Sequence, residues 1–322
     1  MKLHIIIPNY NGCHFLSKCL DSLRRQTYRN FYITVVDNGS TDQSLTFLRE
    51  QYPEVQILEQ NHNLGFSAAA NIGIQSSVSP YVMLLNNDTI LAPDCIYHMM
   101  RVAQKNPHAF SVGAHILTMQ KPHRTDTTGD FYSIYGYAFC RDQGFPAGTP
   151  SCRQVFTNCG CAVIYRRSLL HLTGLFHPDY FAYLEDVDLG FRARRLGFQN
   201  LFCREAIVYH VGSGTTGEKY TPFKVYHSAR NNVWLQRENL TPLQLILHAP
   251  FTLIGTALKY FYFRRLHLHT IYRKGLLDGW KTHQNSHASG IRSFLRTEPW
   301  ILYGTFLYTV QYIRRKLFLR SN

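Results

Sequence analysis

The sequence predicts an α/β protein with a mostly parallel sheet that helices cover on both faces. Through residue 118, short apolar runs of strand length alternate with longer segments whose apolar residues recur at helical spacing. This alternation is typical of parallel sheets, because the chain must cross back over the sheet before each new parallel strand. Residues 240–322 follow another pattern: they are basic, aromatic and mainly helical, and we expect them to form an appendage.

Five strands are predicted from runs that are rich in β-branched and other apolar residues. The first, LHIIIPNY, is apolar until Pro8, and such continuous runs indicate strands buried on both faces. The predicted strands span residues 3–10, 31–37, 55–60, 81–88 and 109–118.

Four helices are predicted between these strands. Asp42 or Thr41 is expected to cap the second helix, and Pro93 precedes the fourth. The helices span residues 14–26, 42–52, 67–77 and 94–106. Segment 119–155 is rich in Gly, Pro, Thr and Asp, which predicts an irregular excursion, and segment 156–210 returns to strand, helix and strand.

Polar clusters follow three of the predicted strands. In open parallel sheets, ligands bind outside the carboxyl ends of the strands, so we expect these clusters to meet at one edge and form a binding site. The clusters are Asn9-Tyr10-Asn11, Asp37-Asn38-Gly39-Ser40 and Asn86-Asn87-Asp88.

Three side chains in these motifs each admit two interpretations. Asp37 is either part of an ordinary turn or a carboxylate that holds a nucleotide base or ribose. Asp88 is either a strand-end cap or an oxygen ligand for Mg²⁺ or Mn²⁺ on a diphosphate. His210, which precedes the glycine-rich segment VGSGTTG, is either structural or a further metal ligand.

The segment FAYLEDVDLGFRARRLG places Glu185, Asp186 and Asp188 near the start of a predicted helix. If that helix begins by about Leu184, then Glu185, Asp188 and Arg192 share one face and can pair with one another. Asp186 lies about 100° away and has no basic residue three or four positions later. The pattern therefore predicts two scaffold carboxylates and leaves Asp186 available for chemistry.

Absent motifs exclude several classes of enzyme. No GxGxxG follows the first strand, which disfavours a nicotinamide dehydrogenase, and its absence also disfavours a nucleotidyltransferase with a glycine-rich phosphate loop. The chain has neither the GxxxxGK[ST] loop of P-loop NTPases nor the GxSxG elbow of many hydrolases.

Positive charge is concentrated in the appendage. Residues 240–322 contain 12 Lys and Arg residues against two acids, whereas residues 1–239 contain 22 against 18. Aromatic residues interleave with these cations, as in KYFYFRRLHLHTIYRKG, and amphipathic helices of this composition suit an anionic membrane surface. The other interpretation is an ordinary helical subdomain packed on the core. Nucleic acid is disfavoured as a partner, because no RNA-binding pattern accompanies the aromatics.

The sequence indicates a cytoplasmic protein without a clean membrane span. The stretch LHIII before Pro8 is too short for a signal peptide, and the best apolar run, residues 242–263, contains His248 and Lys259. The eight cysteines form no CxxC pair, and we expect free, buried thiols.

Taken together, six motifs resemble the inverting nucleotide-sugar glycosyltransferases of family 2, and more narrowly bacterial rhamnosyltransferases that build surface polysaccharides. The resemblance extends over about residues 1–235 and implies a GT-A fold, in which residues 1–239 bind the nucleotide sugar and the acceptor. Residues 240–322 lie outside the resemblance, and their association with a membrane surface is predicted from their composition. The motifs are HIIIPNYNG, VVDNGSTD, NLGFSAAANIGI, MLLNNDT, FAYLEDVDLGFRARRLG and YHVGSGTT.

The resemblance also implies the chemical roles of individual residues. Asp186 matches the family's catalytic base, with Glu185 and Asp188 in support. Asp88, in NND, matches the last position of the family's metal-binding DxD, and His210 matches the histidine that completes the metal shell. The implied cofactor is Mg²⁺ or Mn²⁺, and the single acid in NND leaves the identity of the metal open.

Further positions are implied around the donor. Arg230 and Asn231 match an RN pair often found after the active-site loop. The residues implied at the donor nucleotide are Pro8, Asn9, Tyr10, Asp37, Asn38, Gly65 and Asn87.

The function implied is metal-dependent, inverting sugar transfer at the inner face of the cell membrane. The first choice of donor is dTDP-rhamnose, before UDP-hexoses, and the acceptor is a hydroxyl of a lipid-linked or oligosaccharide glycan. Homo-oligomerisation is left open. The alternative function is a non-catalytic carbohydrate- or membrane-surface-binding module on a degenerate transferase fold.

Overall fold

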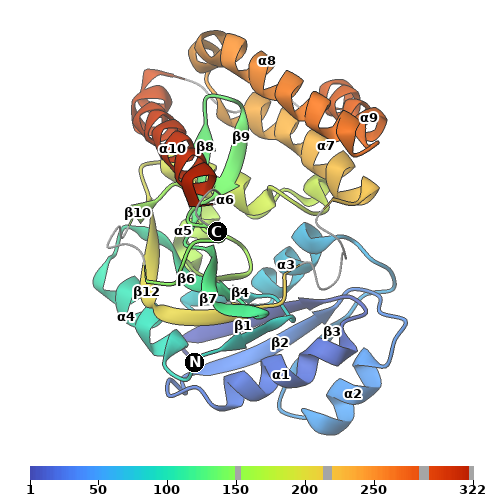
Figure 1. Ribbon diagram of the computed structural model, residues 1–322. Helices are drawn as coiled ribbons and strands as arrows, with labels where there is room; N and C mark the ends of the chain where they lie inside the picture. The colour runs from blue at the N-terminus through green and yellow to red at the C-terminus, as the bar shows by residue number, and fades with distance from the viewer. Residues whose placement is uncertain (149–153, 213–219, 283–289, 319–322) are drawn as a thin grey trace.

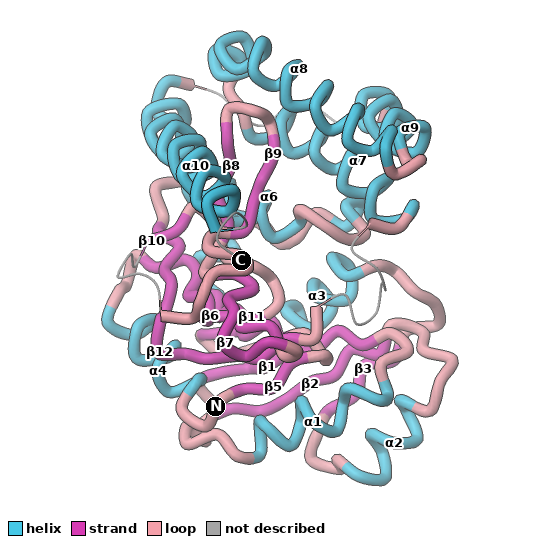
Figure 2. Tube along the Cα trace, in the orientation of Figure 1, coloured by secondary structure: helices cyan, strands magenta, loops and turns pink. Residues whose placement is uncertain are grey.

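The computed structural model of the protein describes residues 1–148, 154–212, 220–282 and 290–318 (Figure 1). Within these residues, ten strands form one sheet and two more form a separate hairpin (Figure 2). The sheet strands are β1 Leu3–Asn9, β2 Phe31–Asp37, β3 Gln56–Glu59, β4 Tyr81–Leu85, β5 Thr89–Leu91, β6 Ala109–Thr118, β7 Lys121–Thr127, β10 Gln154–Val155, β11 Ala162–Arg166 and β12 Gln199–His210; the hairpin joins β8 Asp130–Ser133 and β9 Tyr137–Cys140.

The central part of the sheet is parallel, as predicted. Strand β1 pairs in parallel with β2 and β4, β2 pairs in parallel with β3, and β6 pairs in parallel with β12. Strand β11 lies antiparallel between β4 and β6. Since β1 and β2 run in register from Leu3–Phe31 to Asn9–Asp37, their polar carboxyl ends lie side by side.

Helices cover both faces of the sheet and explain why β1 is apolar at successive positions. Ile5 and Ile7 pack with α1, α2 and α4, whereas Ile6 packs with α3, α5 and α6, and all three side chains are fully buried. The first group of helices is α1 Cys13–Arg24, α2 Ser44–Gln51 and α4 Cys95–Lys105, and the second is α3 Phe66–Gln75, α5 Arg167–Thr173 and α6 Glu185–Arg195.

Two sequence-based predictions about the middle of the chain were wrong. Segment 119–155 was predicted to be irregular, yet it contains β7, β8, β9 and β10. Gly136 and Gly144 lie at turns between short strands, whereas Pro122, Thr125 and Asp126 lie within β7. Composition alone does not separate such short strands and turns from a long loop. Segment 156–210 holds α5 and a short 3₁₀ helix, Pro178–Tyr180, in addition to the one predicted helix.

Four helices follow β12 and pack on the rest of the protein. They are α7 Pro222–Asn239, α8 Pro242–Arg265, α9 His269–Lys281 and α10 Ile291–Phe318. Phe131 of β8, Phe191 of α6, Leu235 of α7 and Ile301 of α10 share one apolar cluster. The appendage therefore packs on the core on one side. The predicted domain boundary at 239 coincides with the end of α7 and remains a prediction.

None of the described helices is long and apolar enough to cross a membrane. The cysteines that the structure describes are all free, and Cys95, Cys161 and Cys203 are among the buried ones. Cys152 lies outside the described residues.

Candidate active site

Side-chain hydrogen bonds join the carboxyl ends of three neighbouring strands. Asn87 Nδ2, after β4, donates to Asn9 Oδ1 at the end of β1 over 2.7 Å, and Asn9 Nδ2 donates to Asp37 Oδ1 at the end of β2 over 3.0 Å. The second Asp37 oxygen accepts from the backbone N–H of Ser40 at 3.0 Å. The three polar clusters thus meet at one edge of the sheet, as their positions after parallel strands predicted.

A cavity of about 1160 Å³ lies between this sheet edge and the C-terminal helices. Opposite the sheet edge, the lining includes Tyr137 of β9, Lys224 of α7, and Lys259 and Tyr262 of α8. Most of the predicted site residues line it from the other side: Pro8, Asn9, Tyr10, Asn38, Gly65, Asn87, Asp88, Glu185, Asp186 and His210. The predicted residues that do not line it are Asp37, Asp188, Arg230 and Asn231.

Sheet register brings His210 to Asp88. Strand β12 pairs antiparallel with β5 and sets His210 opposite Thr89, the residue after Asp88. His210 Nε2 lies 3.2 Å from Asp88 Oδ1, and His210 Nδ1 lies 2.9 Å from Asp126 Oδ2. Burial disfavours the charged ring, but the neighbouring acidic groups of Cys161, Asp126 and Asp88 outweigh it, so the pKa of His210 is raised.

The donor atoms of Asp88 and His210 fit one divalent cation. Two ligand atoms about 2.1 Å from an ion in an octahedral shell lie about 3 Å apart, close to the 3.2 Å between Oδ1 and Nε2. Asp126 holds the other ring nitrogen, as carboxylates commonly do for metal-binding histidines. Sequence reasoning missed Asp126, because it lies in the segment that was predicted to be irregular, and a lone acid there gives no signal.

A second group of candidate ligands is Asp130, Cys159 and Asp186, whose ligand atoms lie within 4.8 Å of one another. Burial raises the pKa of the Cys159 thiol well above its ordinary value, and sulfur is a poor ligand for Mg²⁺ and Mn²⁺. Burial and the Asp186 charge also raise the pKa of Asp130. The group therefore suits an acid pair better than it suits Mg²⁺ or Mn²⁺, which prefer oxygen ligands.

Backbone groups hold the Asp186 carboxylate at the start of α6. The helix begins at Glu185, directly after Leu184, as the sequence predicted. Asp186 Oδ1 accepts from the Val187 N–H and Oδ2 from the Gly160 N–H, both at 2.8 Å. Each oxygen has a second lone pair beyond the one that accepts from the backbone, and the Cys159 side chain is a further hydrogen-bond partner of the carboxylate. Burial raises the pKa of Asp186 although these bonds oppose the rise, which makes the carboxylate a stronger base than an exposed aspartate.

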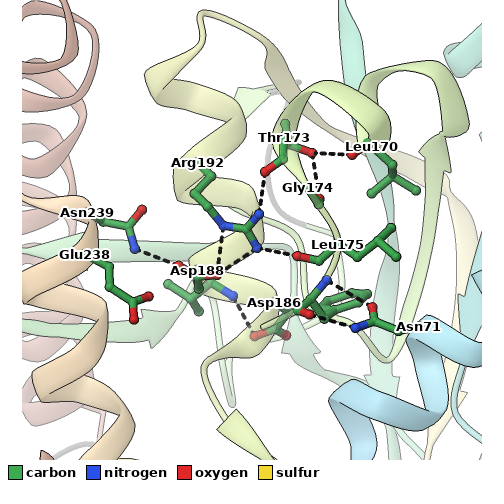
Figure 3. A network of polar contacts seen from close by, with 12 residues as sticks. Asn71, Leu170, Thr173, Gly174, Leu175, Asp186, Asp188, Arg192, Glu238 and Asn239 are labelled. Atoms are coloured by element: carbon green, nitrogen blue, oxygen red, sulfur yellow. Dashed lines mark hydrogen bonds and ion pairs between the residues drawn. The ribbon is translucent and has the colours of Figure 1, made fainter. Parts of the chain in front are cut away.

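Asp188 is a scaffold residue that ties α6 to its neighbours (Figure 3). Its Oδ2 accepts from Arg192 at 2.8 and 2.9 Å, and its Oδ1 accepts from Asn239 Nδ2 at the end of α7 over 2.7 Å. Arg192 also donates to the carbonyls of Thr173 and Leu175 after α5. The predicted pairing of Asp188 with Arg192 is confirmed.

Glu185 does not join this pairing. It lines the cavity and is buried, and among the described residues its Oε2 accepts no hydrogen bond. Burial and the adjacent Asp186 charge raise its pKa. The raised pKa favours the protonated, neutral form of Glu185 beside Asp186. Arg192, the basic residue on the same face of α6, pairs with Asp188 instead.

Arg230 and Asn231 act on the loop that precedes α6. Asn231 Nδ2 donates to the carbonyls of Tyr180, Ala182 and Tyr183 at 2.8–2.9 Å. Arg230 donates to the Asp179 and Tyr180 carbonyls, and its guanidinium lies 4.3 Å from the centroid of the Trp234 ring. The RN pair thus holds the loop from α7 and does not enter the cavity.

This loop has an unusual backbone at three residues that line the cavity. Phe181, Tyr183 and Leu184 have φ of 61°, 73° and 69°, a backbone region that residues other than glycine rarely adopt. Each such residue costs about 1–3 kcal/mol and persists only where its surroundings hold it, as Asn231 does here. Gly65 packs against the loop, and a Cβ there would lie 2.6 Å from the Phe181 carbonyl oxygen.

Asp37 does not line the cavity but holds Asn9, which does. Its carboxylate is almost completely buried, with partners in Asn9 and in the turn at Ser40. Direct contact between Asp37 and a nucleotide stays a prediction. The glycine-rich segment after His210 lies mostly in residues 213–219, outside the described residues; before it, the Val211 N–H donates to the Asp88 carbonyl at 3.1 Å.

Comparisons with known proteins give a consistent match. The family model described as glycosyl transferase family 2 matches residues 4–173. The chain is 26% identical over 256 residues to the N-acetylglucosaminyl-diphospho-decaprenol L-rhamnosyltransferase of Mycobacterium tuberculosis, covering 72% of this chain and 83% of that protein. It is 25% identical over 236 residues to the teichoic acid poly(glycerol phosphate) polymerase of Staphylococcus epidermidis, covering 72% of this chain and 30% of that protein.

Solved structures share the fold. The structure of GalNAc-T7 with UDP, GalNAc and Mn²⁺ matches with a TM-score of 0.60 at 13% identity, over 73% of this chain and 47% of that chain. The mannosyltransferase from Pyrobaculum calidifontis in complex with GDP-Man and Mn²⁺ matches with a TM-score of 0.57 at 14% identity, over 96% of this chain and 86% of that chain. These likenesses confirm the predicted GT-A fold class.

Proposed function

The chain belongs to glycosyl transferase family 2, and from this membership we propose that it transfers a sugar from a nucleoside diphosphate to an acceptor hydroxyl with inversion at the anomeric carbon. One observation carries the proposal: a carboxylate suited to act as a base, Asp186, and a pair suited to hold a cation, Asp88 and His210, line the same cavity. That is the pairing which sugar transfer from a diphosphate requires.

In the proposed reaction, Asp186 accepts the proton of the acceptor hydroxyl. The acceptor oxygen forms a bond to the anomeric carbon from the side opposite the diphosphate. The bond between that carbon and the diphosphate oxygen breaks, and its electron pair leaves with the nucleoside diphosphate. A single displacement inverts the configuration. The second lone pair on each Asp186 oxygen supports this role, since the backbone N–H groups of Gly160 and Val187 occupy only one each.

Asp88 and His210 are the residues proposed to hold Mg²⁺ or Mn²⁺. When bound there, the ion would stabilise the negative charge that develops on the departing diphosphate. The presence of Mn²⁺ in the two compared structures supports the choice of cofactor. Asp126 is proposed to orient the His210 ring, with its carboxylate on Nδ1 and the Nε2 atom toward the ion.

For the substrates, we propose L-rhamnose from dTDP-rhamnose as the donor sugar and a lipid-linked glycan as the acceptor, in the synthesis of a cell-surface polysaccharide. The name of the Mycobacterium tuberculosis relative supports both choices. An acceptor of this kind would be met at the inner face of the cell membrane. The outward side of α10 supports such a location, because it exposes Leu302, Phe306 and Ile313 ahead of Arg314 and Arg315.

A panel of nucleotide sugars tests the donor. The protein is heated with dTDP-rhamnose, UDP-hexoses or GDP-mannose, each with Mn²⁺, with Mg²⁺ and with a chelator. A ligand at 100 times its Kd stabilises the fold by about 2.7 kcal/mol, so the correct donor should raise the Tm. Because a metal ion is proposed to hold the donor diphosphate, this rise should appear only when metal is present. We expect dTDP-rhamnose to give the largest shift.

Asp186→Asn completes this test, because it should keep the donor shift and lose transfer. If no nucleotide sugar shifts the Tm or is turned over, the result contradicts the proposal and favours the non-catalytic binding module. A larger shift with another donor would correct the sugar while leaving the reaction in place.

A further inference from the structure

Helix α8 turns its polar side chains inward. A stripe of buried or half-buried residues repeats every three or four positions along it, as one face of a helix does: Gln244, His248, Thr252, Gly255, Lys259 and Phe263. The outward face exposes large apolar residues, among them Leu243, Leu247, Ile254, Leu258 and Phe261. A helix with water on its outer side has the opposite arrangement.

Three of the inward polar residues bind other parts of the protein. Gln244 Nε2 donates to Thr297 Oγ1 at 3.0 Å and to Glu298 Oε2 at 2.8 Å, both on α10. His248 Nε2 lies 2.9 Å from Glu298 Oε1, and Thr252 Oγ1 donates to a backbone carbonyl after β8. These contacts explain why the residues are polar, since buried polar groups need hydrogen-bond partners.

Lys259, further along the same stripe, has no such partner in the described part of the chain. Its ammonium lies 4.1 Å from the centroid of the Tyr137 ring, and no described carboxylate forms an ion pair with it. The side chain lines the cavity, and burial lowers the pKa of Lys259 to about 8. A cation that is removed from water and contacts only one aromatic ring is strongly stabilised when an anion binds beside it.

The two walls of the cavity carry charges of opposite sign. Asp88 and Asp186 line it from the sheet side, whereas Lys224 of α7 and Lys259 of α8 line it from the helical side. Both substrates of the proposed reaction bring phosphate: the donor as a nucleoside diphosphate and a lipid-linked acceptor next to its lipid. The proposed metal pair at the sheet edge serves the donor diphosphate, which leaves the lysine on α8 for the other phosphate.

The outer surface of α8 indicates which phosphate this is. The same helix that directs Lys259 into the cavity exposes Leu258 and Phe261 on its other sides, and Arg264 and Arg265 follow at its end. Apolar side chains with adjacent cations suit the boundary of an anionic lipid layer. A prenyl or acyl chain lying against this surface would bring its phosphate to the wall on which Lys259 lies.

We propose that the α8 wall of the cavity is the subsite for the acceptor's phosphate group, and that Lys259 is the cation that binds it. The inference rests on the proposed function, since it assigns a lipid-linked acceptor to the same cavity. Lys259 would hold the acceptor and leave proton abstraction to Asp186.

Calorimetric titration of farnesyl diphosphate into protein saturated with dTDP and Mn²⁺ tests the proposal. The filled donor site restricts this prenyl diphosphate to the remaining subsite. We expect the wild-type protein to bind it, Lys259→Gln to bind it at least ~10-fold more weakly, because a charge-assisted contact is lost, and Lys259→Arg to stay within ~3-fold of wild type. Lys274→Gln is the matched control, since Lys274 also lies over a tyrosine ring, Tyr226, but outside the cavity.

Far-ultraviolet circular dichroism serves as the folding check, and binding of dTDP with Mn²⁺ separates the two proposals. Unchanged farnesyl diphosphate binding by Lys259→Gln, or no binding by the wild type, overturns the subsite and leaves the proposed function standing. An equal loss of dTDP binding in Lys259→Gln assigns Lys259 to the donor and also overturns the subsite. Failure of the wild type to bind any nucleoside diphosphate contradicts the proposed function itself.

Discussion

The sheet wall and the α8 wall of the cavity follow opposite rules of burial. In β1, the apolar Ile5, Ile6 and Ile7 are fully buried and polar residues gather where the strand ends. In α8, polar residues face inward and apolar residues face outward. The first pattern belongs to a layer that is covered by protein on both sides. The second is the arrangement expected of the proposed layer with protein on one side and a lipid surface on the other.

The two walls also differ in how they hold their polar groups. At the sheet edge, Asn87, Asn9 and Asp37 are fixed by one another. On α8, the Lys259 ammonium lies over the Tyr137 ring and forms no ion pair with a described carboxylate. A fixed array of groups suits a reaction centre, which must be formed before the substrate arrives. A cation that lies on a ring without a described carboxylate partner suits recognition of an incoming phosphate.

The largest effect is expected at Asp188, which ties α6, beside the sheet wall, to α7, which precedes α8. Asp188 lies in the first turn of α6 and binds Arg192 of the same helix and Asn239 of α7. Asp188→Ala removes one member of a buried pair, so we expect a loss of ~3–5 kcal/mol in the free energy of unfolding, measured by urea denaturation. Glu54→Gln, in the exposed pair with Arg24, is the control and should cost under ~1 kcal/mol. Equal effects would show that Asp188 does not tie α6 to α7.

Variants of Asp186 and Glu185 distinguish the proposed catalytic base from a neighbouring carboxylic acid. Asp186→Asn should lower turnover at least ~100-fold with donor binding within a few-fold of wild type, because the amide keeps the shape of the carboxylate and cannot accept the proton. Turnover is followed by release of the nucleoside diphosphate. Glu185→Gln is the matched neighbour and should lose much less. Near-normal turnover in Asp186→Asn would reject the base assignment.

Asp126 tests whether the sheet wall is a metal site. Asp126→Asn leaves His210 without its charged partner, and we expect Mn²⁺ affinity to fall ~10–100-fold, measured by titrating the ion in the presence of dTDP. Asp142→Asn provides a comparison, because Asp142 is a buried acid near Arg141 that does not line the cavity. Unaltered Mn²⁺ affinity in Asp126→Asn would place the metal elsewhere.

The outer face of α8 tests the other wall. Ile254→Ser combined with Leu258→Ser removes two exposed apolar side chains. Partial burial of such residues in a lipid layer contributes about 1 kcal/mol or more each, so partitioning onto vesicles of phosphatidylglycerol and phosphatidylcholine should fall ~10-fold or more. Leu172→Ser, an equally exposed leucine on α5, should leave partitioning unchanged. Equal vesicle binding by all variants would contradict a lipid contact at the outer face of α8.

The smallest effect concerns pH. The pKa of Glu185 is raised in the folded protein, so between its ordinary value near 4.5 and neutral pH the folded state binds more protons than the unfolded state. Stability should therefore fall as the pH rises through this range. Glu185→Gln removes this term and should stabilise the protein by ~1 kcal/mol or more at neutral pH, while matching wild type at pH 4. A stability profile with an unchanged slope in the variant would contradict a buried neutral Glu185.

The sheet wall could be predicted from the sequence because its signals are local. Apolar runs mark the strands, and polar residues after them mark the edge where strands of one direction end. The separation of Asp186 from Asp188 also followed from helical spacing alone, and the Asp188–Arg192 pair is seen. The contact between His210 and Asp126 could not be predicted, since it depends on the pairing of β12 with β5 and on the course of β7.

The α8 wall could not be predicted from the sequence, because it too depends on tertiary contacts. The run 242–263 was recognised only as the best apolar stretch, interrupted by His248 and Lys259 and therefore not a clean membrane span. Its periodicity does not say which side of the helix packs on protein. Only the tertiary contacts of Gln244 and His248 with Glu298 identify the inward side. They place Lys259 in the cavity, where a lysine within an apolar run otherwise suggests only an interrupted span.

Asn231 has a consequence for engineering. Its side chain, on α7, donates to the carbonyls of Tyr180, Ala182 and Tyr183 in the loop that leads into Asp186, a loop with several residues of positive φ. The helical half of the protein therefore sets the path of the segment that delivers the base. A chimera that grafts foreign acceptor-binding helices onto this sheet would have to transfer loop 179–184 and α7 as one cassette. A cut between them would produce an enzyme that recognises the new acceptor and points its base elsewhere.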